Sequence, residues 1–571
     1  MSEIPLAVLW GALFVTLLGS CALTLIGSWL VLWRYRRSVA RAMSMSGFGA
    51  VEQAPAGAAA ASTGAGIVST SPVTASAREE RPSGRAEALF RRAVWAPWLE
   101  TACLAAAGLA YALVLACAYL LATPAARTPT RFALTLWVDL WPLVIAAALT
   151  APRFLRSAAV AAALYFTPFV LGTITLLVFP DAPADSVDAA LLGLRDTVTP
   201  TVMVWFWIVF AGAPTGALLL SLNPRLRAVS PLLLAFTMTA IVSLMTVWIV
   251  TFASPLKDLT FRLAEATPGG WAGWLLLAAS LVLGIAAAAW AGWMVLRWIR
   301  KATLAKVISD RTLVVDALWL FFASYYAMQF VVQGQAWLLT GALAFAVYWI
   351  VLAAARSRVR SRDPSLAPRG LTFLRVFALG PKSNALFDAL AKHWRRVGSM
   401  QLITGPDLAQ STAQPHQLLD FVTGRLARHF IGDAHMLEAR LDLLDRVADR
   451  DGWYRINNFF CRADAWKAVL ARLVQEGDVV LMDLRSFSAH NEGCVHELRH
   501  LVEFVPLGRC VFIVDATTDI GHLRSVLSEA LAGLEATSPN RQATAETVEL
   551  HAHEPGTRAL RNLLHRLSHA A

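Results

Sequence analysis

Between Ile4 and Ala355 the chain consists mainly of long apolar stretches with few charged side chains. A helix needs about 20 mainly apolar residues to cross a bilayer, where water cannot satisfy the backbone amides. Overall, 57% of the 571 residues are hydrophobic and 16% are charged, which excludes an ordinary soluble protein. The sequence therefore predicts an all-α transmembrane bundle with the lipid bilayer as its partner. The nine predicted spans are Ile4–Leu32, Leu99–Leu121, Phe132–Thr150, Ala158–Phe179, Val202–Leu222, Ser230–Phe252, Trp271–Val295, Leu313–Val332 and Ala336–Ala355.

Positive charge alternates along this region. Arg and Lys gather after the odd-numbered spans, as in Arg34 to Arg37 and Arg356 to Arg362, whereas the even-numbered spans are followed by segments such as Asp181 to Asp196. Because cytoplasmic loops keep the excess of positive charge, we expect a multi-pass inner (plasma) membrane protein with its N-terminus outside and its C-terminal domain in the cytoplasm. The net charge of +11 lies beside apolar segments and suits anionic lipid headgroups, so we expect no nucleic-acid partner.

Four regions follow from the changes in composition. Residues 1–42 form the first span and its basic flank, 43–85 an Ala/Ser/Gly/Pro linker, 86–362 the remaining spans, and 363–571 a cytoplasmic domain. The linker has too few large apolar residues to offset the entropy of ordering, so we expect it to be flexible. Its last residue begins a segment, Arg85–Trp98, that mixes arginines with large apolar residues and predicts a short helix in the membrane interface.

Two carboxylates fall within predicted spans, Asp139 and Asp316. Charged residues inside a membrane are often functional, so a transporter-like bundle with a regulatory domain is one hypothesis. The sequence shows neither duplicated halves nor paired broken helices, and Asp316 lies near Arg311 at the cytoplasmic end, where its carboxylate can reach water or an arginine. We therefore favour an anchoring role for the bundle.

From Leu371 onward, short β-rich runs alternate with amphipathic helices, which is typical of a parallel sheet covered on both faces. We expect an α/β, flavodoxin-like domain, whose ligands bind outside the carboxyl ends of the strands. The predicted strands are Thr372–Leu379, Met400–Thr404, Trp453–Phe459, Asp478–Leu484, Cys510–Asp515 and Thr547–His551. The predicted helices are Ser383–Arg396, His416–Phe430, Ala434–Ala448, Ala463–Gln475, Glu492–Phe504, Ile520–Leu531 and Gly556–Ser568.

Two loops of this domain supply candidate ligand-binding residues. The first strand is followed by a turn into a helix N-terminus, which can hold an anion. Another loop follows the strand Asp478–Leu484. The six candidates are Gly380, Lys382, Ser383, Asp483, Ser486 and Ser488. Asp519 is expected to cap the helix that follows it.

The most informative stretch is Gly493-Cys494-Val495-His496-Glu497-Leu498, which comes after two loop serines. It resembles the Toll/interleukin-1 receptor (TIR) superfamily, in which a serine-containing loop runs into a helix with the pattern Trp-Cys-x-x-Glu-Leu. The resemblance covers about Leu371 to Leu531, and Gly493 replaces the family's Trp. It implies a signalling or bacterial defence effector with a five-stranded parallel α/β domain that can self-associate. In enzymatic members the matching glutamate cleaves NAD, so Glu497 is the catalytic candidate and NAD a substrate, not a tightly bound cofactor.

Two other interpretations of the same helix stay open. His496 and His500 match HExxH, whose spacing places both imidazoles on one face, where they can bind zinc with Glu497 as general base. A third zinc ligand in a suitable frame is not evident, because the usual extension of the motif is missing. Alternatively, Glu497 pairs with Arg499 or Arg485 on a helix surface, and the domain is a non-catalytic interaction module. The six scattered cysteines predict reduced, mostly packed thiols.

Overall fold

The chain forms two compact units. The first comprises Met1–Arg34, Trp98–Arg360 and Gln414–Leu419, and the second comprises Tyr35–Pro97, Ser361–Ala413 and Asp420–Ala571. This computed structural model describes residues 6–44, 83–123, 127–150, 160, 163–167, 212–222, 226, 228–252, 256–330, 337, 339–359, 367–376, 381–404, 415–432, 434–461 and 465–571. The predicted linker lies almost entirely outside these ranges.

The first unit is helical. Its elements include α1 (Leu6–Ser44) as far as Arg34, α2 (Ser83–Ala122) from Trp98, α3 (Pro129–Asp139), α4 (Trp141–Thr150), α8 (Ala213–Ser221), α9 (Ser230–Phe252), α10 (Leu256–Ala266), α11 (Trp271–Leu304), α12 (Asp310–Phe330) and α13 (Leu339–Val359). Four helices are long and apolar enough to cross a membrane, at Leu17–Ala42, Gly84–Ala122, Pro268–Leu304 and Leu339–Val359. They overlap the first, second, seventh and ninth predicted spans, with bounds that differ by up to about 15 residues.

The third predicted span is not one continuous helix. It is divided into α3 and α4 at Leu140, which lies two residues before Pro142 and donates its N–H to the carbonyl of Trp137. Proline has no N–H and restricts the residue before it, which explains a break at this point. The fourth span and the first half of the fifth fall largely outside the described ranges. The total of nine spans stays a prediction.

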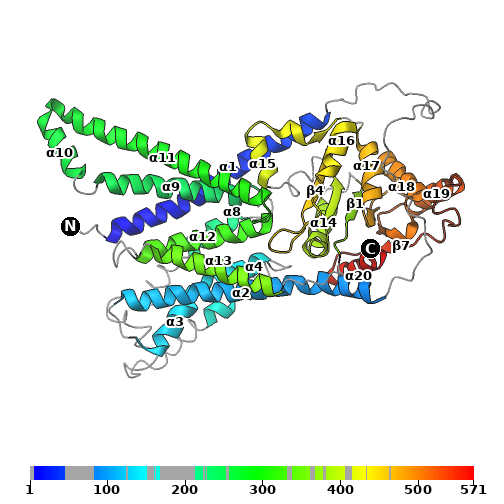
Figure 1. Cartoon of the computed structure of the whole chain (residues 1–571), viewed down its shortest axis with the longest axis horizontal. Coiled ribbons are helices and arrows are strands. Elements are labelled where there is room, and N and C mark those ends of the chain that lie inside the picture. Colours follow the sequence, from blue (N-terminus) through cyan, green and yellow to red (C-terminus); the bar gives the residue numbers. More distant parts are fainter. Residues whose placement is uncertain are drawn as a thin grey trace, which may run out of the picture. The chain divides into compact units, whose positions relative to one another are not determined.

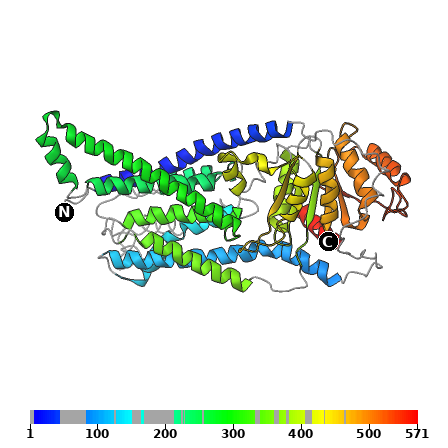
Figure 2. The same cartoon turned by 45° about the horizontal axis from the view of Figure 1, so that its top comes forward.

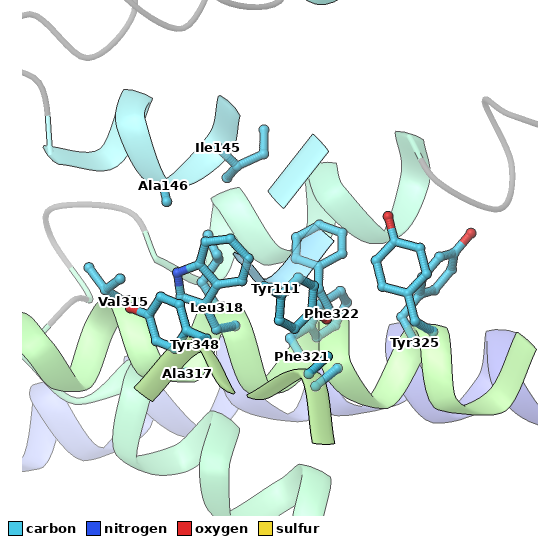
Figure 3. Close-up of a cluster of buried hydrophobic side chains, with 14 of the residues drawn as sticks. Tyr111, Ile145, Ala146, Val315, Ala317, Leu318, Phe321, Phe322, Tyr325 and Tyr348 are labelled. Carbon is cyan, nitrogen blue, oxygen red and sulfur yellow. The ribbon is translucent and has the colours of Figure 1, made fainter. Parts of the chain in front are cut away.

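Aromatic side chains fill the core of this unit where α2, α12 and α13 meet. The Trp319 ring lies 4.8 Å from that of Tyr111 and 4.7 Å from that of Tyr348, and all three are fully buried. Figure 3 shows Tyr111 and Tyr348 together with the neighbouring residues of α12. Asp139 and Asp316 are only 6% and 8% exposed. The part of the expectation for Asp316 that concerned water is contradicted by this burial, whereas contact with an arginine stays a prediction.

Glycines allow α9 and α11 to pack closely. A Cβ atom at Gly292 would lie 2.5 Å from the ring of Phe236, and one at Gly284 would lie 2.7 Å from Leu244. The two helices run side by side in Figures 1 and 2. Small residues at such contacts are how membrane helices gain packing energy when lipid removes the hydrophobic driving force between them.

The second unit contains a seven-stranded, all-parallel sheet in the order β3-β4-β2-β1-β5-β6-β7. The strands are β1 (Leu371–Arg375), β2 (Met400–Ile403), β3 (Phe430–Ile431), β4 (Ile456–Cys461), β5 (Val479–Asp483), β6 (Cys510–Val514) and β7 (Leu550–Ala552). All six predicted strands are confirmed. The first was predicted to extend to Leu379, but the residues after Val376 at its end lie outside the described ranges. The short β3 was missed, because the apolar pattern there predicted a helix through Phe430.

Helices cover both faces of the sheet, as expected. They are α14 (Pro381–Trp394), α16 (Ala434–Asp442), α17 (Trp466–Glu476), α18 (Glu492–Phe504), α19 (Ile520–Ala532) and α20 (Thr557–Ala570). Another helix, α15 (Pro415–Val422), belongs to the first unit as far as Leu419. One buried cluster joins α17, α18 and α19 to the strands, and another joins α14 and α20 to them. Figure 1 shows α17, α18 and α19 on the same side of the strands.

The beginning of α2 belongs to this second unit. Leu89, Phe90 and Ala93 are buried in the same cluster as Leu563 and Leu567 of α20. The prediction of a separate short helix at Arg85–Trp98 is therefore wrong, since this segment is the first part of a 40-residue helix and buries Leu89 and Phe90 against protein, while Trp95 and Trp98 are exposed. The sequence could not distinguish a face that packs on lipid from one that packs on a sheet.

Candidate functional site

Glu497 lies on the buried face of α18. This face is formed by Cys494, Glu497, Leu498, Leu501 and Val502, whose spacing of three and four residues makes one stripe of the helix. The stripe is otherwise apolar and packs in the cluster that contains α17, α19 and the strands. A carboxylate therefore occupies a position at which the local pattern favours an aliphatic side chain.

The surroundings of Glu497 disfavour its charge. The side chain is 2% exposed, and its Oε2 atom has no hydrogen-bond partner among the described residues. Burial raises the pKa of Glu497 to about 8, although the positive charge of Arg375 acts in the opposite direction. The carboxyl group consequently holds its proton at neutral pH in this structure.

Arg375 ends β1 at the centre of the sheet. It is 3% exposed, its Cα is in register with that of Asp483 on β5, and its carbonyl oxygen lies 3.6 Å from the Sγ of Cys494. The chain leaves β1 toward β2 on one side and β5 later pairs on the other. Strand order reverses at this point, which is where open parallel sheets bind their ligands.

The surface pairing proposed for Glu497 is contradicted. Arg499 bonds instead to Glu529 at 3.1 Å, and Arg485 bonds to Asp483. Since Glu497 faces the interior of the domain, neither surface pairing describes its environment.

A second polar cluster lies at the carboxyl ends of β5, β6 and β7. Arg485 donates through Nε and Nη2 to the two carboxylate oxygens of Asp483, at 2.8 and 2.7 Å, and both residues are buried. Burial acts to raise the pKa of Asp515, but hydrogen bonds from Thr517 and Ser486 and the charge of Arg485 outweigh it and lower that pKa. The cluster is thus an anion-cation network whose members already satisfy one another.

The predicted loop serines take part in local structure. The hydroxyl of Ser486 lies 2.8 Å from that of Thr517, and its backbone has a φ of 58°. A left-handed conformation is uncommon for a non-glycine residue and is found preferentially in turns and at functional sites. Ser488 donates its hydroxyl proton to the Oδ1 of Asn491, at 3.1 Å, just before α18 begins.

The residues predicted after β1 are only partly described. Gly380 lies outside the described residues. Lys382 belongs to α14, but its side chain is not described. Ser383 is in the first turn of α14, fully buried, and its hydroxyl has no hydrogen-bond partner in the part of the chain that the structure describes. Asp519 caps α19 as predicted, since its side chain accepts a hydrogen bond from the N–H of His522 at 3.0 Å.

The two histidines of the HExxH match lie on one face of α18, with ring centroids 6.5 Å apart. His496 packs against Trp466 and His500 against Phe504. Within the described ranges, no group of three His, Cys, Asp or Glu side chains is arranged to hold a metal ion. The six cysteines are all described and all free, and four of them are buried, as the sequence indicated.

Sequence reasoning missed two participants. Arg375 was treated only as part of a strand, although a lone arginine in the apolar run Leu374-Arg375-Val376 was a signal for a buried charge. His553 was overlooked as well, and it is 8% exposed beside the second cluster, where burial and then the charge of Arg485 lower its pKa.

Comparison of the chain with known protein families, with curated proteins and with solved structures finds no match.

Proposed function

We propose that this protein is a membrane-anchored, TIR-like signalling or defence effector whose cytoplasmic α/β domain cleaves NAD between nicotinamide and ribose. Glu497 is the catalytic residue in this proposal. The observation that carries it is a carboxyl group that is 2% exposed, with one oxygen free of hydrogen bonds among the described residues, on the helix that follows β5 at the reversal of strand order.

The raised pKa of Glu497 is compatible with this catalytic role if bound NAD favours loss of the proton. Without substrate the carboxyl group is protonated, because burial raises its pKa to about 8. The nicotinamide ring of NAD is positively charged, and a cation within a few ångströms favours the ionised form of a carboxyl group. Substrate binding would therefore release the proton of Glu497 and generate the carboxylate where it is needed.

The reaction then needs no further cofactor. The bond between C1′ of the ribose and N1 of nicotinamide breaks, and its electron pair leaves with nicotinamide. The carboxylate of Glu497 stabilises the positive charge that develops on the ribose, as carboxylates do in glycoside cleavage. Water adds to C1′ and gives a proton to Glu497, so that NAD and water yield ADP-ribose, nicotinamide and one proton.

The membrane region completes the proposal. Nine spans with the N-terminus outside would place the second unit in the cytoplasm, where NAD is present, and anchor it in the inner membrane. The bundle then supplies anchoring, and contact between α/β domains of neighbouring chains brings them together for activity. Four helices of sufficient length and apolarity support membrane association.

The test uses the full-length chain in nanodiscs and in dense proteoliposomes, with release of nicotinamide from NAD as the readout. At NAD concentrations far below saturation, where the rate reports the pKa of the free enzyme, wild type should release nicotinamide faster as pH rises through about 8, whereas Glu497→Gln should be inactive at every pH. Glu503→Gln, on the same helix, is the matched control and should retain activity. Equal release from wild type and Glu497→Gln, or no release from wild type even at high membrane density, would refute catalysis.

A non-catalytic interaction module is the second candidate. It is favoured by the internal pairing of the loop residues, since Asp483 is fully engaged by Arg485 and the hydroxyl of Ser486 by Thr517. Such a module would bind NAD without turnover or not at all. Equilibrium binding of NAD to wild type and to Glu497→Gln in nanodiscs, measured together with nicotinamide release, separates the candidates. Binding without release indicates a binding module, absence of both indicates a module that does not use NAD, and release indicates the enzyme.

A further inference from the structure

A hollow of about 1200 Å³ lies along the edge of the sheet in the second unit. We name it the β7–α20 groove, and its walls are β7, the loop His553–Gly556, one side of α20 and the Phe90 side chain of α2. Neither Glu497 nor Arg375 lines it. Ligand pockets in proteins commonly measure about 300 to 1,000 Å³, so the groove has room for a nucleotide or a large headgroup.

Positive side chains dominate the ionisable lining of this groove. Glu554 is the one acidic residue among the described residues that line it. The basic and titratable residues are Arg558, Arg561, Arg566, His551, His553, His565 and His569. Clefts lined by charge of one sign concentrate ligands of the opposite sign, so this lining selects for anions.

Several donors in the groove have no protein acceptor. Arg558 makes no hydrogen bond or ion pair with any described residue, and Arg561 lies over the ring of Phe90 at 5.6 Å. His553 is 8% exposed, and its imidazole makes no hydrogen bond to the described part of the chain. The ring nitrogens of His553 are not among the buried unpaired atoms of the described residues, so they are accessible from the groove and can bond to a ligand there.

The first turn of α20 adds to this positive potential. Its N-cap residue, Gly556, provides no side-chain hydrogen bond, and the first turn contains no acidic residue. The amides of a helix N-terminus then lack partners and carry the positive end of the helix dipole. Gly556 and Arg558 both line the groove, so these amides border it.

The histidines respond to the same field. Burial lowers the pKa of His551 and of His553, and the charges of Arg566 and Arg485, respectively, lower them further. The charge of Glu549 acts in the opposite direction on His551, and those of Asp483 and Asp515 do so on His553. An anion in the groove would counter this repulsion and favour protonation of both rings. Glu549 lies 3.5 Å from Arg566 and 3.7 Å from His551, so it compensates the charge at these two residues and not at Arg558 or Arg561.

We infer that the β7–α20 groove binds a phosphorylated anion carrying at least two negative charges, held by Arg558, Arg561, His553 and the amides of the α20 N-terminus. Arginine side chains and helix N-termini are the groups that proteins use for phosphate. A soluble nucleotide and a phospholipid headgroup share this chemistry. The site is separate from the proposed catalytic carboxyl group.

The test measures binding of radiolabelled ATP, with pyrophosphate as competitor, to the full chain in phosphatidylcholine nanodiscs. A charge-assisted contact corresponds to about a tenfold change in affinity, so Arg558→Glu with Arg561→Glu should weaken binding about a hundredfold or more. Arg524→Glu, an exposed arginine on α19 outside the groove, is the matched control and should bind as wild type does. Wild-type affinity should increase as pH falls below about 6.5, and His553→Gln should reduce that increase.

A second arm identifies the source of the phosphate. In nanodiscs rich in phosphatidylglycerol, loss of ATP binding by competition assigns the groove to a lipid headgroup, whereas unchanged binding assigns it to a soluble ligand. Thermal unfolding checks that the variants are folded, and Arg558→Glu alone serves if the double variant is not. Absence of saturable binding of both ATP and pyrophosphate in neutral nanodiscs, or equal binding by wild type and the charge-reversal variants, would overturn the inference. Glu497→Gln should bind normally, so failure of NAD cleavage and failure of this site are distinguishable.

Discussion

Replacing Glu497 by glutamine should stabilise α18 by an amount that grows with pH. The folded pKa of this carboxyl is raised to about 8 from an ordinary value of 4.5. Below about pH 4.5 both the folded and the unfolded chain hold the proton, so the group does not affect stability. Between these two values the unfolded chain releases the proton and the folded chain keeps it, so stability falls as pH rises, and above about pH 8 the loss is complete.

The size of this effect follows from the two pKa values. Each tenfold difference in proton affinity corresponds to about 1.4 kcal/mol, so the full loss is about 5 kcal/mol, of which about 3 kcal/mol is present at pH 7. Glutamine has nearly the same shape and does not titrate. The advantage of Glu497→Gln over wild type should therefore increase by about 4 kcal/mol between about pH 5 and pH 8.5.

Amide hydrogen exchange of peptides from α18, measured by mass spectrometry on the full chain in nanodiscs, reports this difference. Wild type and variant are compared at the same pH, so the intrinsic exchange rates cancel. Exchange in Glu497→Gln should be slower by more than about a hundredfold at pH 7. Glu503→Gln, on the same helix, should show no such pH-dependent gain. A constant ratio between Glu497→Gln and wild type across this range, or faster exchange in the variant at pH 8.5, would refute the conclusion that the folded site holds a protonated carboxyl.

Three further changes test the packing of each unit. Gly292→Leu should separate α9 from α11, since even a Cβ there meets the ring of Phe236 at 2.5 Å, and thermal unfolding in nanodiscs should show a lower Tm than for Gly292→Ala. Arg356→Ala should destabilise the first unit by about 1 to 3 kcal/mol because it removes the guanidinium that lies 3.1 Å from the carboxylate of Glu100, which is 6% exposed, and adding Glu100→Gln should recover part of the loss in chemical unfolding. Asn540→Ala should lower the free energy of opening at the C-terminal end of α18 by at least about 2 kcal/mol, because the Asn540 side-chain amide donates hydrogen bonds to two carbonyls there at 2.7 Å. Hydrogen exchange at this end of the helix should therefore be faster, and an unchanged exchange rate would contradict this.

The division of the chain into an apolar helical part and an α/β part was determined by the sequence. Periodicity and length reveal both, because an amide in hydrocarbon must be paired within its own helix, and parallel strands buried on two faces read as short apolar runs. The α18 bounds were predicted to the residue, since the charged and apolar positions there alternate with a clear helical period. The number of spans was not determined in the same way, because proline and shorter apolar runs interrupt the pattern, as at Pro142.

The environment of each charged residue was decided only by the tertiary structure. The sequence predicted that Glu497 could pair with Arg499 or Arg485. In the structure these arginines pair instead with Glu529 on α19 and with Asp483 on β5. Similarly, the groove depends on an edge strand, the last helix and a turn of α2 that are far apart along the chain. Local patterns specify which face of an element is apolar, whereas desolvation and charge pairing depend on which elements the fold brings against that face.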